Sequence, residues 1–110
     1  MKVAIIGTGY VGLSTGVGLA EFGHDVTCID MDKDKIDLLK KGISPIYEPG
    51  IEEYLRKNIN LKRLQFTTST PDGLKEAEII ILAVGTPAMQ DGRTDLSYLE
   101  KASLEISQYV

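Results

Sequence analysis

The sequence predicts an α/β fold, in which a parallel β-sheet carries helices on both of its faces. Two observations predict this fold. Short apolar runs that are typical of strands alternate along the chain with stretches of helical spacing. The most apolar run, 79–84, has no polar alternation, which is typical of a parallel strand buried on both faces. Parallel neighbours need crossover connections, and right-handed crossovers predict the strand order 3-2-1-4.

The first strand and the turn after it are the most informative stretch. A short apolar run at 2–6 leads directly into Gly-Thr-Gly-Tyr-Val-Gly at 7–12. A helical stretch over 10–22 follows, and then a second apolar run, 26–29, which ends on Asp30. This order of strand, glycine turn, helix, strand and acid matches the fingerprint of Rossmann-type dinucleotide-binding folds.

Each glycine of this stretch has a predicted physical role. Gly7 allows the tight turn, and Gly9 leaves room for a pyrophosphate to approach the backbone. Gly12 lets the helix lie close to the strand, and Gly16 and Gly18 extend that smooth surface. The N–H groups of the first helical turn would then face the phosphates, at the positive end of the helix dipole. A corner of strand, turn and helix that binds nothing is the alternative.

Asp30 lies at the position of a ribose-binding acid. It follows Gly12 by 18 residues, and a spacing of about 20 is typical of a carboxylate that accepts the ribose hydroxyls. Because its charge would repel a 2′-phosphate, the site favours NAD over NADP. Lys35 lies just beyond, where a cation could reach the adenosine end of the cofactor.

A second helix is predicted directly after Asp30. Asp32 is a suitable N-cap, Ile36 and Leu39 form the inward stripe, and Gly42 ends the helix. The stretch 43–50 reads as an extended connector.

The connector's two prolines restrict the residues before them, and Pro49 suits the first position of a short helix that ends near Asn58. A weak strand is predicted at 64–68, and Thr70 supplies the hydroxyl cap of another short helix. The last helix begins near Asp95, and one of its faces carries Leu96, Leu99, Ala102, Ile106 and Val110.

Gly85, Thr86 and Pro87 end the strand at 79–84. In the predicted order the ligand lies between the first and fourth strands, so these residues would come next to the glycine turn. Residue chemistry alone leaves two interpretations open, a simple strand-ending turn and a contact with the cofactor.

Composition narrows the function further. The 110 residues suit one small domain, 1–110, and the net charge of −4 argues against nucleic acid and anionic membranes as partners. The opening apolar run is too short for a signal peptide, which predicts a cytoplasmic protein. Cys28 reads as a buried, inert thiol, and His24 as a surface turn residue after Gly23. With no second His or Cys, no metal site is expected.

Three stretches together resemble one family. GTGYVGL at 7–13, PIYEPG at 45–50 and AVGTP at 83–87 are similar to the N-terminal NAD-binding domain of the UDP-glucose/GDP-mannose dehydrogenases, UDP-glucose dehydrogenase most of all. The resemblance covers essentially the whole chain. PIYEPG makes it far more specific than the glycine fingerprint, because that run plays no part in general nucleotide binding.

The resemblance implies roles for the predicted site. The glycine loop with Tyr10 and Val11 would bind NAD, Asp30 would hold the adenosine ribose with Lys35 beside it, and Thr86 would contact NAD near its nicotinamide half. The family oxidises the C6 hydroxyl of a nucleotide sugar to a carboxylate in two NAD-dependent steps, through a cysteine thiohemiacetal and thioester.

The family's catalytic cysteine and lysine lie later in a chain several times this length, and Cys28 does not match that cysteine. We therefore expect a partial NAD-binding domain that lacks the second half of its fold and is inactive alone. Its nucleotide-sugar substrate would bind through downstream domains. Because the apolar strand 79–84 would then be a sheet edge, a homo-oligomer is expected.

Two alternatives remain open. One is a stand-alone NAD-binding or regulatory module without catalysis, which a downstream GxCxxK-like region would exclude. The other is a dehydrogenase of the hydroxyacyl-CoA or 6-phosphogluconate type, against which PIYEPG and Gly-Thr-Pro argue.

Overall fold

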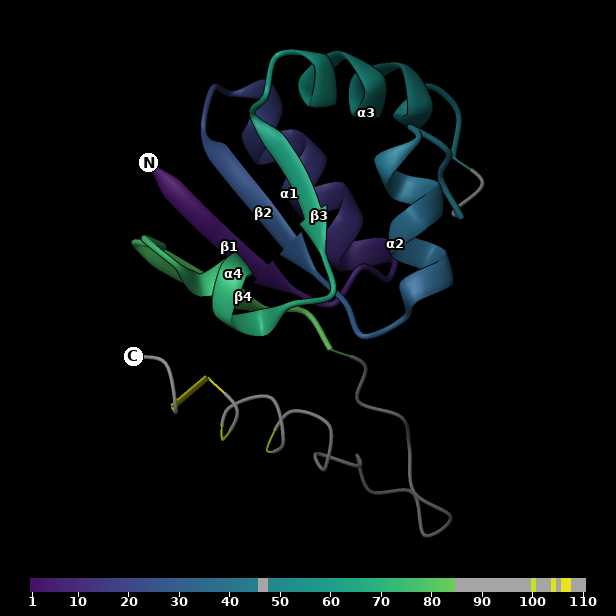
Figure 1. Ribbon diagram of the computed structural model, residues 1–110. Coiled ribbons are helices and arrows are strands. Elements are labelled where there is room, and N and C mark those ends of the chain that lie inside the picture. The colour runs from purple at the N-terminus through teal and green to yellow at the C-terminus, as the bar shows by residue number, and fades with distance from the viewer. Residues whose placement is uncertain (46–47, 85–99, 101–103, 105, 108–110) are drawn as a thin grey trace, which may run out of the picture.

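A computed structural model shows a four-stranded parallel sheet in the order β3-β2-β1-β4, as predicted (Figure 1). The residues that the structure describes are 1–45, 48–84, 100, 104, 106 and 107. The strands are β1 (Lys2–Ile6), β2 (Asp25–Ile29), β3 (Leu64–Thr67) and β4 (Ile79–Leu82). The helices are α1 (Tyr10–Glu21), α2 (Lys33–Lys40), α3 (Ile51–Asn60) and α4 (Thr70–Leu74). Ile5 of β1 pairs with Cys28 of β2 on one side and with Ile81 of β4 on the other.

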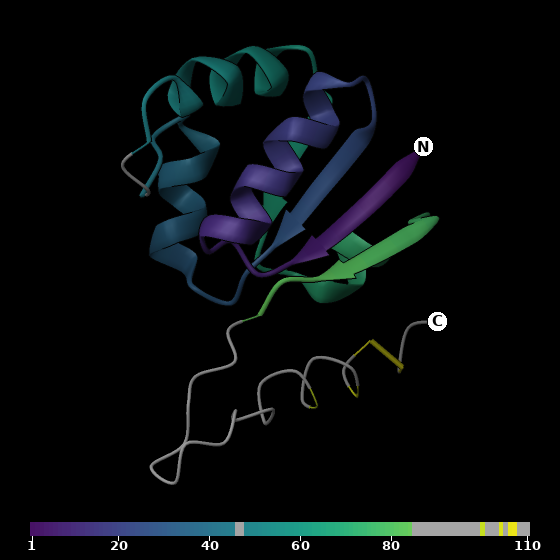
Figure 2. The ribbon, with the colours of Figure 1, turned by 180° about the vertical axis from the view of Figure 1, so that it is seen from behind.

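Helices cover both faces of the sheet, as the alternating pattern predicts. Figure 1 and Figure 2, which view the molecule from opposite sides, place α1 on one face and α4 on the other. Helix α3 packs against α1, and α2 contacts β3. On the α4 face, Leu74 packs with Ala4 and Ile29, and the partly buried Ile106 joins this cluster. None of the helices among the described residues is long and apolar enough to cross a membrane.

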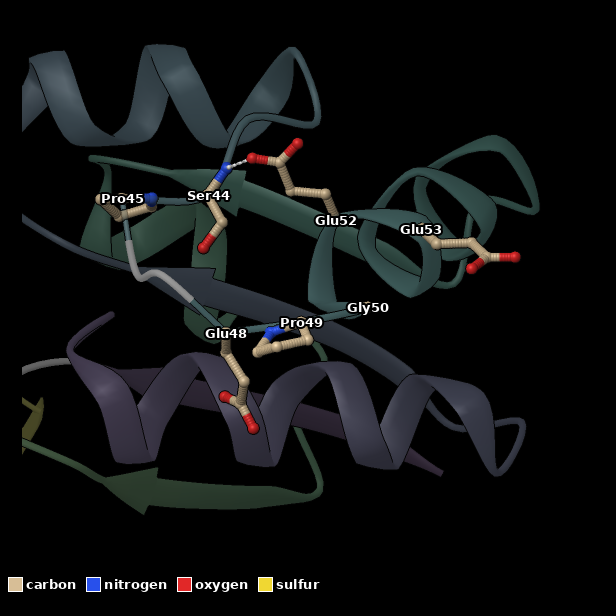
Figure 3. A pocket seen from close by; sticks show the side chains of 7 residues that line it. All are labelled: Ser44, Pro45, Glu48, Pro49, Gly50, Glu52 and Glu53. Atoms are coloured by element: carbon tan, nitrogen blue, oxygen red, sulfur yellow. Dashed lines mark hydrogen bonds between the residues drawn. The ribbon is translucent and has the colours of Figure 1, made fainter.

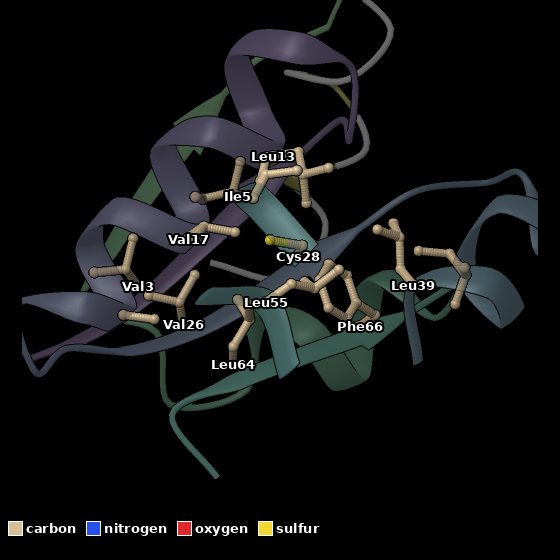
Figure 4. Packing of buried hydrophobic residues seen from close by; sticks show 13 residues of the cluster. Val3, Ile5, Leu13, Val17, Val26, Cys28, Leu39, Leu55, Leu64 and Phe66 are labelled. Carbon is tan, nitrogen blue, oxygen red and sulfur yellow. The ribbon is translucent and has the colours of Figure 1, made fainter. Parts of the chain in front are cut away.

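The larger hydrophobic core lies between the sheet and the helices α1, α2 and α3 (Figure 4). Cys28 lies inside it with no exposed surface, and burial raises the pKa of its thiol to about 12. A thiol with this pKa is protonated at neutral pH and is a poor nucleophile. The prediction that Cys28 is buried is confirmed.

The glycines of α1 do not all serve the same purpose. A Cβ at Gly12 would lie 2.0 Å from the carbonyl oxygen of Gly7, and one at Gly16 would lie 2.8 Å from Cys28 Sγ. Both glycines therefore allow the close approach of helix and strand that the sequence predicts. Gly18 does not, since a Cβ there would meet nothing within 4 Å. The prediction that Gly18 extends the packing surface is wrong.

The predicted start and end of α3 both need correction. Pro49 is not the first residue of α3, because Gly50 is its N-cap in a left-handed conformation (φ +83°) and the helix begins at Ile51. This helix also runs on to Asn60 rather than ending near Asn58.

The cap of α4 is Ser69 and not Thr70. Ser69 has an extended backbone, and its hydroxyl accepts a hydrogen bond from the Asp72 N–H at 3.4 Å. Thr70 is already the first helical residue, so its own side chain lies one position too late to cap. The cap of α2 is Asp32, as predicted, with its carboxylate accepting from the Lys35 N–H at 3.1 Å.

The last part of the chain is described only in part. Strand β4 ends at Leu82, two residues before the predicted end, and lies at an edge of the described sheet. Ile79 is 43% exposed and the other residues of β4 are partly exposed, so this strand is not buried on both faces here. The described residues 100, 104, 106 and 107 are helical, while the predicted helix start at Asp95 lies outside the described residues.

Candidate dinucleotide-binding site

The carboxyl ends of β1, β2 and β4 meet beside the turn that leads into α1. The Gly7 N–H donates to the Ile29 carbonyl at 2.8 Å, and the Ala83 N–H donates to the Ile6 carbonyl at 2.8 Å. Gly7 has φ +104°, and a Cβ there would lie 2.6 Å from the Ala83 carbonyl oxygen. Only glycine fits this turn, because its backbone is left-handed and the backbone of Ala83, the residue after β4, lies directly against it. The glycine turn therefore lies where β1 and β4 end, at the point between these strands where the sequence predicts the ligand.

The N-terminus of α1 opens away from the packed side of the turn. Gly9 is the N-cap, no side chain caps the helix there, and a Cβ at Gly9 would meet nothing within 4 Å. Tyr10 and Val11 follow with 60% and 67% of their surfaces exposed. The first N–H groups of a helix have no intrahelical partner, and the helix dipole favours negative charge there. This end of α1 fits a pyrophosphate.

The carboxylate of Asp30 is tied to the glycine turn from the end of β2. Its Oδ2 accepts hydrogen bonds from the Thr8 N–H at 3.0 Å and from the Thr8 hydroxyl at 2.6 Å. Its Oδ1 accepts from the Asp32 N–H at 3.0 Å. Lys35 Nζ lies 3.5 Å from Oδ2, and the Asp30 side chain is 17% exposed. The predicted acid and its predicted neighbouring cation are thus together beside the turn.

These contacts set the charge of the acid. Burial raises the pKa of Asp30, but the hydrogen bonds from Thr8 and Asp32 and the positive charge of Lys35 outweigh burial and lower the pKa below its usual range. Asp30 is therefore ionised at neutral pH. An ionised, partly exposed carboxylate can accept a ribose hydroxyl, and its charge opposes a 2′-phosphate. The residues present fit NAD.

One group of predicted site residues lies outside the described part of the chain, and one contact of Asp30 was not predicted. Gly85, Thr86 and Pro87 follow β4 in sequence but lie outside the described residues. Thr8, which donates two hydrogen bonds to Asp30, is not among the residues that the sequence predicts for the site. Its only signal was a hydroxyl between two glycines, and the importance of that hydroxyl depends on where the end of β2 comes to lie.

The described residues of the second family stretch, 45 and 48–50, precede α3, and Gly50 is the N-cap of this helix. The cavity beside it has a volume of about 560 Å³ and is lined by Ser44, Pro45, Glu48, Pro49, Gly50, Glu52 and Glu53 (Figure 3). The Ser44 N–H donates to Glu52 Oε1 at 3.3 Å, which ties the connector to the first turn of α3. None of the residues that line this cavity belongs to the glycine turn, so we separate it from the nucleotide site.

The strand order, the glycine turn at the start of α1 and the acid at the end of β2 define a Rossmann-type dinucleotide-binding domain. The family model described as "UDP-glucose/GDP-mannose dehydrogenase family, NAD binding domain" matches residues 1–110. The chain belongs to this family, in agreement with the resemblance of its motifs, and NAD is the cofactor of the matched domain.

A sequence relative and two solved structures that are similar to this chain agree with the family assignment. UDP-glucose 6-dehydrogenase YwqF of Bacillus subtilis is 54% identical over 110 residues, which are 100% of this chain and 25% of the relative. The solved GDP-mannose dehydrogenase from Pseudomonas aeruginosa has a TM-score of 0.93 and 38% identity, covering 96% of this chain and 24% of the other.

UDP-D-ManNAc dehydrogenase from Pyrococcus horikoshii has a TM-score of 0.93 and 34% identity, over 100% of this chain and 26% of the other. The chain therefore spans about a quarter of the length of the relatives it matches.

Proposed function

We propose that this chain is the NAD-binding portion of a nucleotide-sugar 6-dehydrogenase of the UDP-glucose type. Such an enzyme oxidises the C6 hydroxyl of the sugar to a carboxylate in two NAD-dependent steps. The single observation that carries the proposal is the ionised Asp30 carboxylate, held by Thr8 against the open N-terminus of α1. The identity to UDP-glucose 6-dehydrogenases along the whole chain supports the substrate class.

The proposed roles follow the geometry of the turn. Gly7 and Gly12 shape the turn, and Gly9 leaves the space into which the pyrophosphate fits. The backbone of Tyr10 and Val11 begins the helix that faces the phosphates. NAD, when bound, supplies the acceptor for the hydride of each oxidation step.

The remaining roles concern the two ends of the cofactor. Asp30 accepts from the adenosine ribose, with Lys35 beside it. We extend the site to Gly85, Thr86 and Pro87, which follow directly after β4 and the Ala83–Val84 pair in sequence. We assign no catalytic residue to 1–110, because the Cys28 thiol is buried in the core with a pKa of about 12.

Calorimetric titration of NAD and NADP into the full-length protein tests the proposal. NAD should bind more tightly than NADP. Asp30→Ala should weaken NAD binding by about tenfold or more, because a hydrogen bond to a charged group is lost. NADP binding should weaken less in this variant, since a repulsive charge is removed at the same time.

Asp37→Ala is the matched control, because it removes one carboxylate from the exposed surface of α2. It should leave the ratio of the two affinities unchanged. Equal affinity of the unaltered protein for NAD and NADP would contradict the role of Asp30.

A further inference from the structure

Thr8 is a polar residue that the glycine fingerprint does not specify, yet it has no exposed surface. It lies between Gly7, which makes the turn, and Gly9, where the phosphate site opens. Both of its donors, the backbone N–H and the side-chain hydroxyl, go to Oδ2 of Asp30. The hydroxyl bond of 2.6 Å is the shorter of the two, as expected for an O–H that donates to a carboxylate.

The acceptor sites of Asp30 can be counted oxygen by oxygen. An ionised carboxylate has about four lone-pair sites, two on each oxygen. Thr8 takes two of them on Oδ2, and the Asp32 N–H takes one on Oδ1. Lys35 Nζ is 3.5 Å from Oδ2, which makes it an ion-pair partner at the limit of hydrogen bonding. One good acceptor site, on Oδ1, has no partner among the described residues.

We propose that Thr8 is a positioning residue that holds Oδ2 of Asp30 inward, so that Oδ1 alone receives a ribose hydroxyl of the cofactor and the carboxylate stays where it excludes a 2′-phosphate. The inference rests on the proposed function of Asp30. It adds that the preference for NAD depends on a hydroxyl group 22 residues earlier in the chain.

The physical reason is the freedom of the carboxylate without its clamp. If the Thr8 hydroxyl is removed, the remaining partners of Oδ2 among the described residues are the backbone N–H of Thr8 and Lys35 Nζ, 3.5 Å away. The Asp30 side chain can then rotate toward Lys35 and water, which turns Oδ1 away from the ribose. The carboxylate also loses a strong charge-assisted hydrogen bond at the side facing the turn.

Three variants of Thr8 in the full-length protein test this. Thr8→Val keeps the shape of the side chain without its hydroxyl, Thr8→Ala removes the hydroxyl without adding any atom, and Thr8→Ser keeps it. NAD and NADP are titrated into each by calorimetry, and thermal unfolding of each is recorded. Thr8→Val and Thr8→Ala should lower NAD affinity by about tenfold, while Thr8→Ser should stay within about threefold of the unaltered protein.

The ratio of the two affinities separates positioning from general stability. In Thr8→Val and Thr8→Ala the preference for NAD over NADP should narrow, and Thr8→Ser should restore it. If the affinities for NAD and NADP fall by the same factor, or do not change, the preference for NAD is unaltered. Thr8 then does not position Asp30, and the inference is overturned. If Thr8→Val fails to fold, Thr8→Ala against Thr8→Ser still compares two side chains that differ by one oxygen.

The failure of the proposed function would look different. It would show as equal binding of NAD and NADP, or as no binding of NAD, in the unaltered protein. The failure of this inference would show only in the variants, with the preference of the unaltered protein intact.

Discussion

The charge of Asp30 links its proposed role in cofactor binding to the stability of the fold. Its pKa is lowered because hydrogen bonds from Thr8 and Asp32, together with Lys35, outweigh the effect of burial. In the unfolded chain the same carboxyl has the usual aspartate pKa of about 4. The unfolded state therefore takes up a proton at a higher pH than the folded state does, and the contacts of Asp30 stabilise the folded state only while it is ionised.

The lowered pKa of Asp30 predicts how the stability of the fold depends on pH. The contribution of Asp30 should be fully present above pH 4–5, roughly its unfolded range, and should be lost as the pH falls through the lowered pKa. Urea unfolding of the unaltered protein and of Asp30→Asn should show a stability gap at pH 6 that closes toward about pH 2. Asp37→Asn controls for the loss of one charge on α2. A gap that stays constant over this range would show that the carboxylate contacts do not stabilise the fold.

Helix α1 lies close to the sheet because Gly12 faces the turn at Gly7 and Gly16 faces side chains of β1 and β2. Gly16 is the clearer case, since a Cβ there would lie 2.8 Å from Cys28 Sγ and 3.3 Å from Ile5 Cδ1. Both neighbours are fully buried, so neither can move without disturbing the core. Gly18 is on the same helix and has no atom within 4 Å of such a Cβ. This pair separates the effect of packing from the helix propensity of glycine.

We predict opposite effects of alanine at these two positions. Gly16→Ala should lower the free energy of unfolding by about 1–3 kcal/mol, because it overpacks the core against Cys28. Gly18→Ala should leave it unchanged or raise it by about 0.5–1 kcal/mol, because alanine favours the helix and meets nothing. Urea unfolding at neutral pH measures both. Equal changes in the two variants would show that close packing at Gly16 does not limit the side chain.

At the scale of the whole molecule, β4 lies at one edge of the described sheet. β4 pairs with β1, and Ile79 is 43% exposed at this edge. An exposed apolar edge strand is a template for pairing with another chain. The partly buried Ile106 packs into the cluster on the α4 face with Ile80. It therefore adds cover to one face of the sheet, and this contact by itself does not cap the edge.

We propose that the segment 1–110 associates through this edge, most simply as a two-fold dimer. Light scattering coupled to size exclusion should show a mass that rises with concentration. Ile79→Lys should reduce this association, because a charge at an edge opposes strand pairing. Phe22→Ser is the control, since it removes an 86% exposed apolar side chain from the end of α1 instead. A monomer at all concentrations would mean that the chain itself caps the edge.

The sequence by itself determined the order of the elements and the position of the glycine turn at the end of β1. Strand and helix periodicity, the glycines of 7–12 and the acid at Asp30 all act through neighbours in the chain or through the general rules of parallel sheets. The order 3-2-1-4 and the place of the turn followed from these features, and the structure has both. The cap of α4 did not follow, because Ser69 and Thr70 both carry a hydroxyl that can cap a helix and backbone geometry selects between them.

Only the tertiary structure decided which distant atoms meet. Gly16 and Gly18 are the same residue two positions apart, but at about 100° per residue they face opposite sides of α1, and only one of them meets Cys28. In the same way, nothing in the local sequence distinguishes the hydroxyl of Thr8 from that of any exposed threonine. The folding of β2 beside β1 brings Asp30 Oδ2 within 2.6 Å of it, and that proximity across 22 residues makes a loop hydroxyl a hydrogen-bond donor to Asp30.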